Sequence, residues 1–226
     1  MPLQRRRRAR PVTDPSGLSI EQERSLPPEQ DLLGDVPPRA PRPRPTGGSA
    51  PLPRHCWFFA LRPDARDAAR IHAFAGELLA SRGISGSRIA PERLHVTLDL
   101  VGHDVNQAVV DAACGAADSI RLPALEVTFD TAGSFSAPSG PFVLLGSEGL
   151  DAVRALRISL GSALADWGFV PPRSYEPHMT LCYDRRRRVP RAPVAPIGFH
   201  AGEFALVKSH IGLSRHEVLR TWRLAG

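Results

Sequence analysis

Apolar and polar positions follow a regular pattern only from about residue 55 onward. The run Cys56–Leu61 is apolar throughout, which is typical of a buried strand. After Pro63 and Asp64, apolar residues recur at helical spacing as far as Gly83, so this segment is predicted to be a helix. A buried strand followed by an amphipathic helix indicates a domain that mixes both kinds of element.

More helices and strands are predicted along the rest of the chain. One helix is expected from Asp104, as its N-cap, to about Ser119, and another from about Leu150 to Trp167, with Gly168 after its end. The further predicted strands are Leu94–Val101, Leu125–Phe129, Phe142–Gly146, His178–Tyr183, Glu203–His210 and Glu217–Leu224. This order indicates an α+β fold with antiparallel or mixed sheets. The two halves resemble each other, because each has a helix followed by a proline-containing loop and a histidine-led strand.

The first 54 residues differ in composition from the patterned region. They contain 12 of the 23 prolines and none of the 14 aromatic residues. Such a segment buries too little apolar surface to offset its chain entropy, so residues 1–54 are predicted to be a disordered tail and residues 55–226 a folded domain. With 10 arginines and 6 acidic residues, the tail carries +4 of the formal +6 charge. The folded domain is therefore only mildly basic.

The composition excludes several classes of protein. No apolar run approaches the roughly 18 residues that a membrane span requires. Three cysteines, Cys56, Cys114 and Cys182, are too few for a disulfide scaffold and lack the spacing of zinc ligands. The tail fits neither a secretory signal nor a transit peptide. We therefore expect a soluble, cytoplasmic monomer with no membrane contact and no obligate protein partner.

The candidate chemistry lies in the pattern His-x-Thr-Leu, which occurs in two of the predicted strands. Chance predicts about 0.03 copies in a chain of this composition. Because side chains alternate along a strand, His95 and Thr97 are expected on one face, about 6–7 Å apart, with their neighbours turned into the core. His178 and Thr180 repeat the arrangement. The repetition favours a functional pair over two structural histidines.

Two imidazoles facing each other across a cleft suit general acid–base catalysis. An unperturbed histidine titrates near pH ~6.5, so one can accept a proton while the other gives one. Threonine hydroxyls can donate hydrogen bonds to an anionic oxygen. A phosphoryl group fits this set, because in-line displacement at phosphorus needs a base, an acid and donors to the equatorial oxygens.

A metal site is the alternative use of the histidines. Asp99 and Cys182 are predicted on the histidine faces, but zinc sites have three or four ligands and neither strand offers a second histidine or glutamate beside the first. No metal and no cofactor are therefore expected. The chain also lacks a glycine-rich phosphate loop and a serine nucleophile elbow, which argues against kinases, NTPases and common hydrolases.

The two motifs belong to a longer set of segments that resembles the two-histidine phosphoesterase superfamily. Within it, the chain is most similar to the bacterial and archaeal RNA 2′,3′-cyclic phosphodiesterases, often labelled 2′-5′ RNA ligases. The resemblance covers about residues 56–225 and leaves the tail outside. Besides the two motifs, it includes Trp57–Pro63, Ile89–His95, Arg173–His178, Phe204–Ser209 and Trp222–Leu224.

The resemblance implies a fold and a reaction. The fold is bilobal, with two similar lobes and outer helices that flank a central cleft. The reaction is metal-independent hydrolysis of a terminal 2′,3′-cyclic phosphate on RNA or a small nucleotide, leaving a 2′-phosphate. It implies that His95 donates a proton to the leaving 3′-oxygen, that His178 activates water, and that Thr97 and Thr180 hold the phosphate.

Two departures from the family bear on substrate binding. Relatives commonly have an arginine where this chain has Tyr183. Four arginines follow just beyond it, Arg185, Arg186, Arg187 and Arg188. A basic loop is usually a solvated run of charge, but this one could supply phosphate contacts or follow an RNA backbone. At His216 relatives often carry a tyrosine, so the base-stacking side of the cleft is expected to differ.

Two alternatives to hydrolysis stay open. The reverse reaction, which joins RNA ends through a 2′-5′ bond, uses the same residues, so the sequence does not separate ligation from hydrolysis. An RNA-binding module that has kept the cleft and lost turnover is the other alternative, suggested by Tyr183 and the basic tail. Two complete motifs favour an enzyme.

Overall fold

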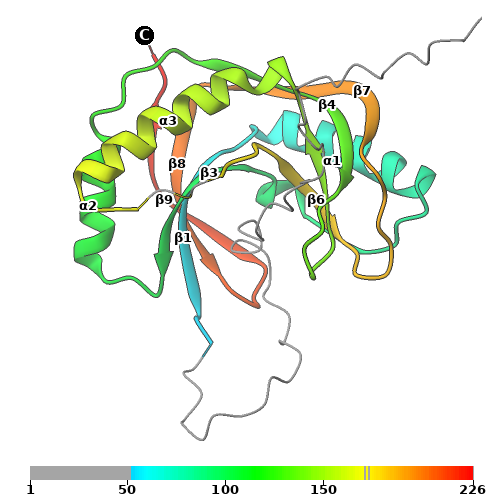
Figure 1. The fold of residues 1–226 in the computed structure, drawn as a ribbon, viewed down its shortest axis with the longest axis horizontal. Helices are drawn as coiled ribbons and strands as arrows, with labels where there is room; N and C mark the ends of the chain where they lie inside the picture. Colours follow the sequence, from blue (N-terminus) through cyan, green and yellow to red (C-terminus); the bar gives the residue numbers. More distant parts are fainter. Residues whose placement is uncertain (1–51, 171, 173, 226) are drawn as a thin grey trace, which may run out of the picture.

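The computed structural model describes residues 52–225 except 171 and 173, and its strands form one antiparallel sheet (Figure 1). The strands are β1 (His55–Leu61), β2 (Ser87–Arg88), β3 (Val96–His103), β4 (Leu125–Ser134), β5 (Pro141–Leu145), β6 (Met179–Tyr183), β7 (Ala192–Ala201), β8 (Glu203–His210) and β9 (Arg215–Arg223). The helices are α1 (Ala65–Ser81), α2 (Gln107–Ala117) and α3 (Asp151–Asp166), with single 3₁₀ turns η2 (Pro91–Arg93) and η3 (Glu148–Leu150).

The order of the strands divides the sheet into two lobes. The order is β7-β4-β5-β6-β3-β1-β8-β9, with β2 paired to β6. We call β1, β3, β8 and β9 the first lobe and β4 to β7 the second lobe. The lobes meet where β3 lies beside β6, at the single residue pair Val96 and Met179. Each lobe thus places its His-x-Thr-Leu strand at the junction, which confirms the predicted bilobal α+β fold.

Helices and a continuous core hold the two lobes together. α1 begins after Pro63 and Asp64 as predicted, and Asp64 caps it, accepting a hydrogen bond from the Asp67 amide at 2.7 Å. α1 follows the first strand yet packs against η2 and β7, while α3 contacts both β3 and β4. The core beneath the helices includes Phe59 of the first lobe and Phe129 of the second, both fully buried. Burial of such a side chain contributes about 1.5–3 kcal/mol, so truncating either would loosen a lobe.

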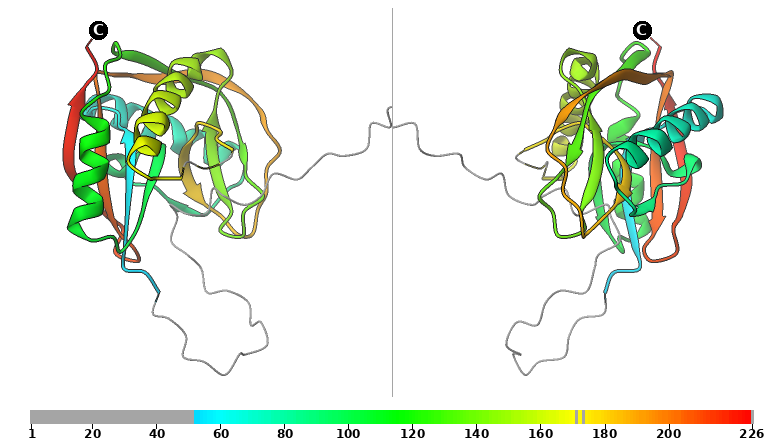
Figure 2. Two further views of the ribbon diagram at one scale, coloured as in Figure 1. Left: turned by 60° about the vertical axis from the view of Figure 1, so that its left-hand side comes forward. Right: turned by 90° about the vertical axis from the view of Figure 1, so that its right-hand side faces the viewer.

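Two strands were not predicted from the sequence, the two-residue β2 and the longer β7. β7 contains Pro193 and Pro196, which argue against a strand when the sequence alone is considered. The strand lies at one edge of the sheet, where an absent backbone N–H is tolerated. Figure 2 shows this strand, in orange, arching over the second lobe. β4 is also longer than predicted, because it pairs with β7 along most of its length.

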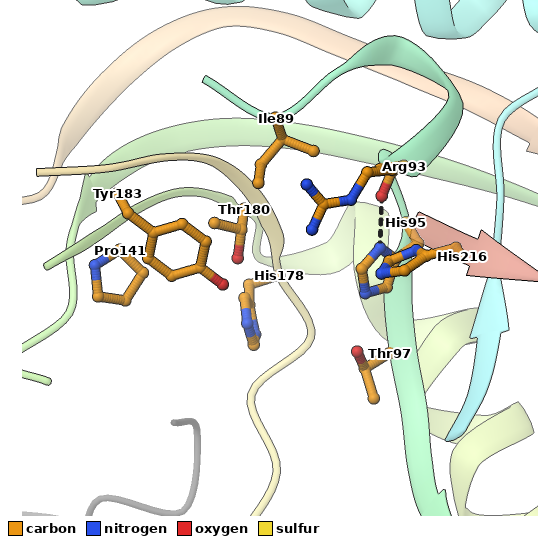
Figure 3. A pocket seen from close by; sticks show the side chains of 9 residues that line it. All are labelled: Ile89, Arg93, His95, Thr97, Pro141, His178, Thr180, Tyr183 and His216. Carbon is orange, nitrogen blue, oxygen red and sulfur yellow. Dashed lines mark hydrogen bonds between the residues drawn. The ribbon is translucent and has the colours of Figure 1, made fainter. Parts of the chain in front are cut away.

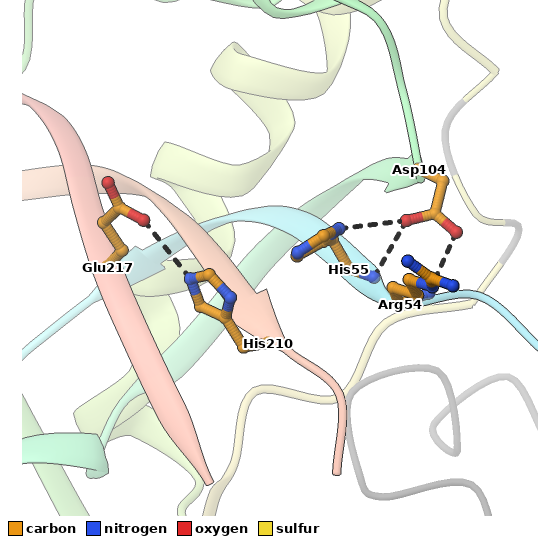
Figure 4. A network of polar contacts seen from close by, with 5 residues as sticks. All are labelled: Arg54, His55, Asp104, His210 and Glu217. Carbon is orange, nitrogen blue, oxygen red and sulfur yellow. Dashed lines mark hydrogen bonds and ion pairs between the residues drawn. The ribbon is translucent and has the colours of Figure 1, made fainter. Parts of the chain in front are cut away.

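The predicted N-cap of the second helix is wrong. Asn106 caps α2, its side chain accepting from the Val109 amide at 3.1 Å. Asp104 instead has a positive φ of 44°, and its carboxylate accepts hydrogen bonds from the backbone amides of Arg54 and His55, each at 2.9 Å (Figure 4). The backbone of Arg54 is thus bound to the folded part through Asp104.

The predicted disordered tail lies mostly outside the described residues, which begin at Leu52. No helix among the described residues is long and apolar enough to span a membrane. The end of α3 is as predicted, with Gly168 in the left-handed region at φ 86° just after the helix.

Candidate active site

A pocket at the junction of the lobes contains both motifs (Figure 3). Each lobe contributes side chains to its wall, and further residues come from the segment before the first motif. The lining residues are Ile89, Arg93, His95, Thr97, Pro141, His178, Thr180, Tyr183 and His216. The structure therefore brings together all four predicted motif residues, although the two motifs lie far apart in the chain.

The two histidines are held in the same way. Nδ1 of His95 lies 2.6 Å from the carbonyl oxygen of Arg93, and Nδ1 of His178 lies 2.8 Å from that of Glu176. A carbonyl oxygen only accepts, so each Nδ1 carries a proton and donates it. The Nε2 atom of each ring is then left to gain or lose a proton. In each case the supporting carbonyl belongs to the residue two positions earlier, so the two lobes repeat one local structure.

Aromatic rings fix the plane of each imidazole. The ring of Phe58 on β1 lies 5.0 Å from that of His95, and the ring of Phe135, which follows β4, lies 4.9 Å from that of His178. His216 on β9 lies edge-on to both His95 and Phe58, at 5.3 and 5.6 Å. Packed rings of this kind limit the rotation of the imidazoles, so their Nε2 atoms keep one direction.

A β-bulge follows the threonine in both motifs. Thr97 pairs with Ala60 and Asp99 with the preceding residue of β1, Phe59, so Leu98 is the extra residue. The register of β6 with β5 shifts in the same way around Leu181. Thr97 and Thr180 stay half-buried in the pocket wall, while the two residues that follow each of them are buried.

The bulges overturn one prediction from strand alternation. Asp99 and Cys182 were expected on the histidine faces, and this is wrong, because the extra residue turns both away. Asp99 pairs with Arg157 of α3 at 3.7 Å, and Cys182 lies in the core beneath the helices. Within the described residues no group of three or more histidine, cysteine, aspartate or glutamate side chains could hold a metal ion.

Burial makes the pocket unfavourable for positive charge on its histidines. It lowers the pKa of His95 from 6.5 to about 4, against the opposing effect of the hydrogen bond to Arg93, and charge on His178, Arg93 and Arg62 lowers it further. Burial also lowers the pKa of His178, although the Glu176 carbonyl and carboxylate oppose this. The pKa of His216 falls to about 3, chiefly through burial and then through His95. All three imidazoles are therefore neutral at pH 7 when the pocket is empty.

The predicted basic contacts lie apart from the pocket. Tyr183 lines it, but Arg185 to Arg188 lie exposed on the loop after β6 and are not among the lining residues. The buried Asp184 shapes this loop, its carboxylate accepting from the Arg186 and Arg187 amides at 2.8 and 3.1 Å. The side chain of Arg188 donates to the Ala137 carbonyl.

Arg93 is the pocket residue that the sequence did not reveal. It ends the η2 turn two positions before His95, and its guanidinium extends into the pocket (Figure 3). No periodic pattern marks such a residue. Its position before the motif histidine, in a proline-led turn, is a signal that could have been used.

The comparisons with known proteins agree with this geometry. The sequence profile of the 2′-5′ RNA ligase superfamily matches residues 63–210. No curated protein matches the sequence. The structure of Escherichia coli LigT in apo form is 26% identical with a TM-score of 0.63, covering 77% of this chain and 99% of that one.

Two further solved structures share the fold. Escherichia coli LigT complexed with 3′-AMP is 25% identical with a TM-score of 0.64, covering 76% of this chain and 99% of its own. TT0787 of Thermus thermophilus is 18% identical with a TM-score of 0.61, covering 76% and 98%. The profile match spans more than half of the chain and includes both motifs. The chain therefore belongs to the 2′-5′ RNA ligase superfamily, the two-histidine phosphoesterases.

Proposed function

We propose that this protein is an RNA 2′,3′-cyclic 3′-phosphodiesterase that hydrolyses a terminal 2′,3′-cyclic phosphate to a 2′-phosphate. One observation carries the proposal: two imidazoles, each with Nδ1 held by a backbone carbonyl, line one pocket together with two threonine hydroxyls. The pocket thus offers a base, an acid and hydrogen-bond donors around one small space, the set that displacement at phosphorus requires.

In the proposed reaction, Nε2 of His178 accepts a proton from a water molecule as its oxygen attacks phosphorus. The bond from phosphorus to the 3′-oxygen breaks, and Nε2–H of His95 gives its proton to that oxygen. The hydroxyls of Thr97 and Thr180 donate to the non-bridging oxygens, where negative charge accumulates. The products are a 2′-phosphate and a free 3′-hydroxyl, and a proton returns from His178 to solvent while His95 takes one up.

The protonation states of the two histidines before substrate binds fit only one of the two proposed roles. A neutral His178 is ready to act as a base at pH 7. His95 must be protonated to act as an acid, which burial opposes. A phosphate anion bound against His95 raises its pKa, so the acid acquires its proton together with the substrate. The catalytic state is thereby coupled to binding of the anion.

The test uses 2′,3′-cyclic AMP in the presence of EDTA, with products separated by ion-exchange chromatography. We expect turnover without added metal and 2′-AMP as product. His95→Asn and His178→Asn should each lower kcat by about 10²–10⁴-fold, the usual contribution of a general acid or base. Full activity in either variant would refute the two-imidazole mechanism. Formation of 3′-AMP would refute the proposed direction of ring opening.

Ligation is the second candidate, and the family profile itself favours it. The same pocket can accept a 5′-hydroxyl as the nucleophile in place of water. Its oxygen then bonds to phosphorus, the bond to the 3′-oxygen breaks, and the two RNA ends are joined through a 2′-5′ bond. An RNA that ends in a cyclic phosphate, incubated with a second RNA that starts with a 5′-hydroxyl, distinguishes the two. A joined product resistant to a 3′-5′-specific nuclease indicates a 2′-5′ bond. A strand of unchanged length that ends in a 2′-phosphate indicates hydrolysis, and an intact cyclic end indicates binding alone.

For an RNA substrate, we propose that the exposed arginines 185–188 contact phosphates beyond the terminal nucleotide, with Tyr183 at the pocket wall beside that path. Each such phosphate contact releases counterions, so binding of a longer RNA should weaken with salt more steeply than binding of a mononucleotide. Replacing the four arginines by glutamine should reduce this salt dependence. It should leave hydrolysis of 2′,3′-cyclic AMP unchanged, because the four side chains do not line the pocket.

A further inference from the structure

The pocket contains one side chain with a permanent charge. Among the described residues that line it, Arg93 alone is cationic at every physiological pH, since the three histidines are neutral there. Figure 3 shows its guanidinium extending from the first lobe across the pocket towards Thr180 and His178 of the second. A substrate phosphate placed between the two motifs would therefore meet this guanidinium.

The guanidinium of Arg93 lacks a full set of partners. Its Nε is buried and has no hydrogen-bond partner among the described residues. A buried donor without an acceptor is unfavourable, because it has lost its hydrogen bonds to water, and such groups are rare in folded proteins. An anion with several oxygens would supply what this planar, multi-donor group needs.

The equivalent position in the second lobe is occupied by a residue of opposite charge. Glu176 stands two residues before His178, as Arg93 stands two residues before His95, and both support their histidine through a backbone carbonyl. The carboxylate of Glu176 is bound by Arg191 through two hydrogen bonds of 2.6 and 2.7 Å. This pair neutralises itself, and neither residue lines the pocket. The charge of the pocket thus comes from one side.

We propose that the side chain of Arg93 binds a non-bridging oxygen of the substrate phosphate and is the cation that balances its charge in this protein. The inference rests on the proposed function, in that the phosphate is that of the cyclic phosphodiester. It places the phosphate-binding cation in the first lobe, next to the proposed acid. Arg93 then has two separate tasks, because its backbone carbonyl orients His95 while its side chain binds the substrate.

The separation of tasks makes the side chain testable. Replacement of Arg93 removes the guanidinium but leaves the carbonyl that holds Nδ1 of His95. A change in activity therefore reports the guanidinium, not a misplaced imidazole. Loss of one charge-assisted contact predicts a fall of about 10- to 100-fold in both kcat/KM and anion affinity. Loss of the nearby positive charge should also raise the pKa of His95, which NMR titration of the imidazole measures.

The experiment compares wild type, Arg93→Gln, Arg93→Lys and Arg223→Gln. Arg223 is exposed at the far end of β9, seven residues from His216, and serves as the matched control. Hydrolysis of 2′,3′-cyclic AMP gives kcat and KM, and calorimetric titration with sulfate gives anion affinity independently of turnover. Arg93→Gln should lose both, Arg93→Lys should fall between, and Arg223→Gln should match wild type.

The outcomes separate this inference from the proposed function. Sulfate affinity and kcat/KM within twofold of wild type in Arg93→Gln would overturn it, even if the protein hydrolyses the cyclic nucleotide. An inactive wild type that binds sulfate through Arg93 would overturn the phosphodiesterase and leave the anion site standing. If Arg93→Gln has a lower melting temperature, Arg93→Lys is compared with wild type instead. Wild-type sulfate affinity in Arg93→Lys, together with an unchanged pKa of His95, would show that the planar guanidinium group is not required.

Discussion

The hydroxyl of Tyr175 donates a hydrogen bond to the backbone carbonyl of Thr97 at 2.8 Å, and this contact joins the approach to the second motif to the strand of the first. Arg157 of α3 lies over the Tyr175 ring, 5.3 Å from its centre, and pairs with Asp99 just beyond the bulge. The sheet itself joins the lobes through one residue pair. The Tyr175 contact is therefore a further connection across the junction, made to the backbone of a residue that lines the pocket.

Tyr175→Phe is expected to weaken this connection without leaving a cavity. Loss of one hydrogen bond of this kind costs about 0.5–1.5 kcal/mol of unfolding free energy. We also expect a several-fold loss of kcat/KM on 2′,3′-cyclic AMP, because Thr97 and its lobe gain freedom relative to the second motif. Urea denaturation and steady-state kinetics measure the two effects. Stability reduced with kinetics unchanged would show that the contact does not set the width of the pocket.

The glycine just before β5 is expected to be irreplaceable. Gly140 has φ 73°, and a Cβ there would lie 2.0 Å from the Asp184 carbonyl oxygen. Gly168 also has a positive φ, of 86°, but a Cβ there would meet nothing within 4 Å. Gly168→Ala should therefore cost about 1 kcal/mol from backbone strain alone. Gly140→Ala adds overpacking of roughly 1–3 kcal/mol.

The same substitution should reach the pocket. The Gly140 carbonyl accepts from the Asp184 amide at 2.8 Å, and the neighbours Pro141 and Tyr183 both line the site. The added methyl group of Gly140→Ala would push these two segments apart and shift one wall of the pocket. Gly140→Ala should therefore lower kcat/KM, while Gly168→Ala should not. Thermal melts and kinetics on both variants provide the comparison, and equal effects at the two positions would contradict the steric explanation.

Activity is expected to be highest below pH 6.5. The dependence of kcat/KM on pH reports the free protein, whose working form carries one proton on the pair of imidazoles. Because the pKa values of His95 and His178 are both lowered, this form becomes scarcer as pH rises above 6.5, about tenfold per pH unit. At still lower pH the second imidazole is protonated too, and activity falls again.

The measurement uses 2′,3′-cyclic AMP between pH 4 and 8.5, a range in which the phosphodiester itself keeps one charge. The variant Arg93→Gln is the internal control, because it should move the alkaline limb to higher pH. A profile that is flat or rises between pH 6.5 and 8 would contradict the neutral state of the empty pocket.

The sequence predicted the motif chemistry better than it predicted the surroundings of the motifs. Alternation along a strand correctly places Thr97 and Thr180 in the pocket, because it depends on neighbouring residues only. It fails at Asp99 and Cys182, because a bulge depends on the partner strand, which a sequence pattern does not contain. β7 was not predicted, and only the sheet order shows that its prolines lie in an edge strand, where they are tolerated.

Charge was the least predictable property of the site. A run of four arginines is conspicuous in the sequence, yet hydrogen bonds to Asp184 shape its loop on the surface. Arg93 is inconspicuous, but the proline-led turn before the first motif carries it into the pocket. The position of a cation relative to a cleft depends on loop geometry, whereas each motif histidine directly precedes the strand that carries its threonine.

A chain that begins at Leu52 is expected to retain full activity on a small cyclic nucleotide. It keeps all residues of the pocket, as well as the backbone of Arg54, whose amide donates to Asp104 and whose carbonyl accepts from Ile211 at 2.9 Å. Kinetics on 2′,3′-cyclic AMP compare it with the full chain. A large loss of turnover would show that the first 51 residues take part in catalysis.

In that shorter chain, Asp104→Asn should lower the melting temperature. Backbone hydrogen bonds from Arg54 and His55 lower the pKa of Asp104, so the folded state favours the charged carboxylate. The stabilisation that the charged carboxylate provides is fully present above its pKa in the unfolded chain, about 4, and is lost as pH falls through its lower pKa in the folded protein.

Asparagine tolerates the positive φ of this position, so backbone strain does not enter the comparison. The difference in melting temperature between the two proteins should therefore be largest near neutral pH and vanish towards pH 2. A gap for Asp104→Asn that persists at pH 2 would point to side-chain geometry in place of charge.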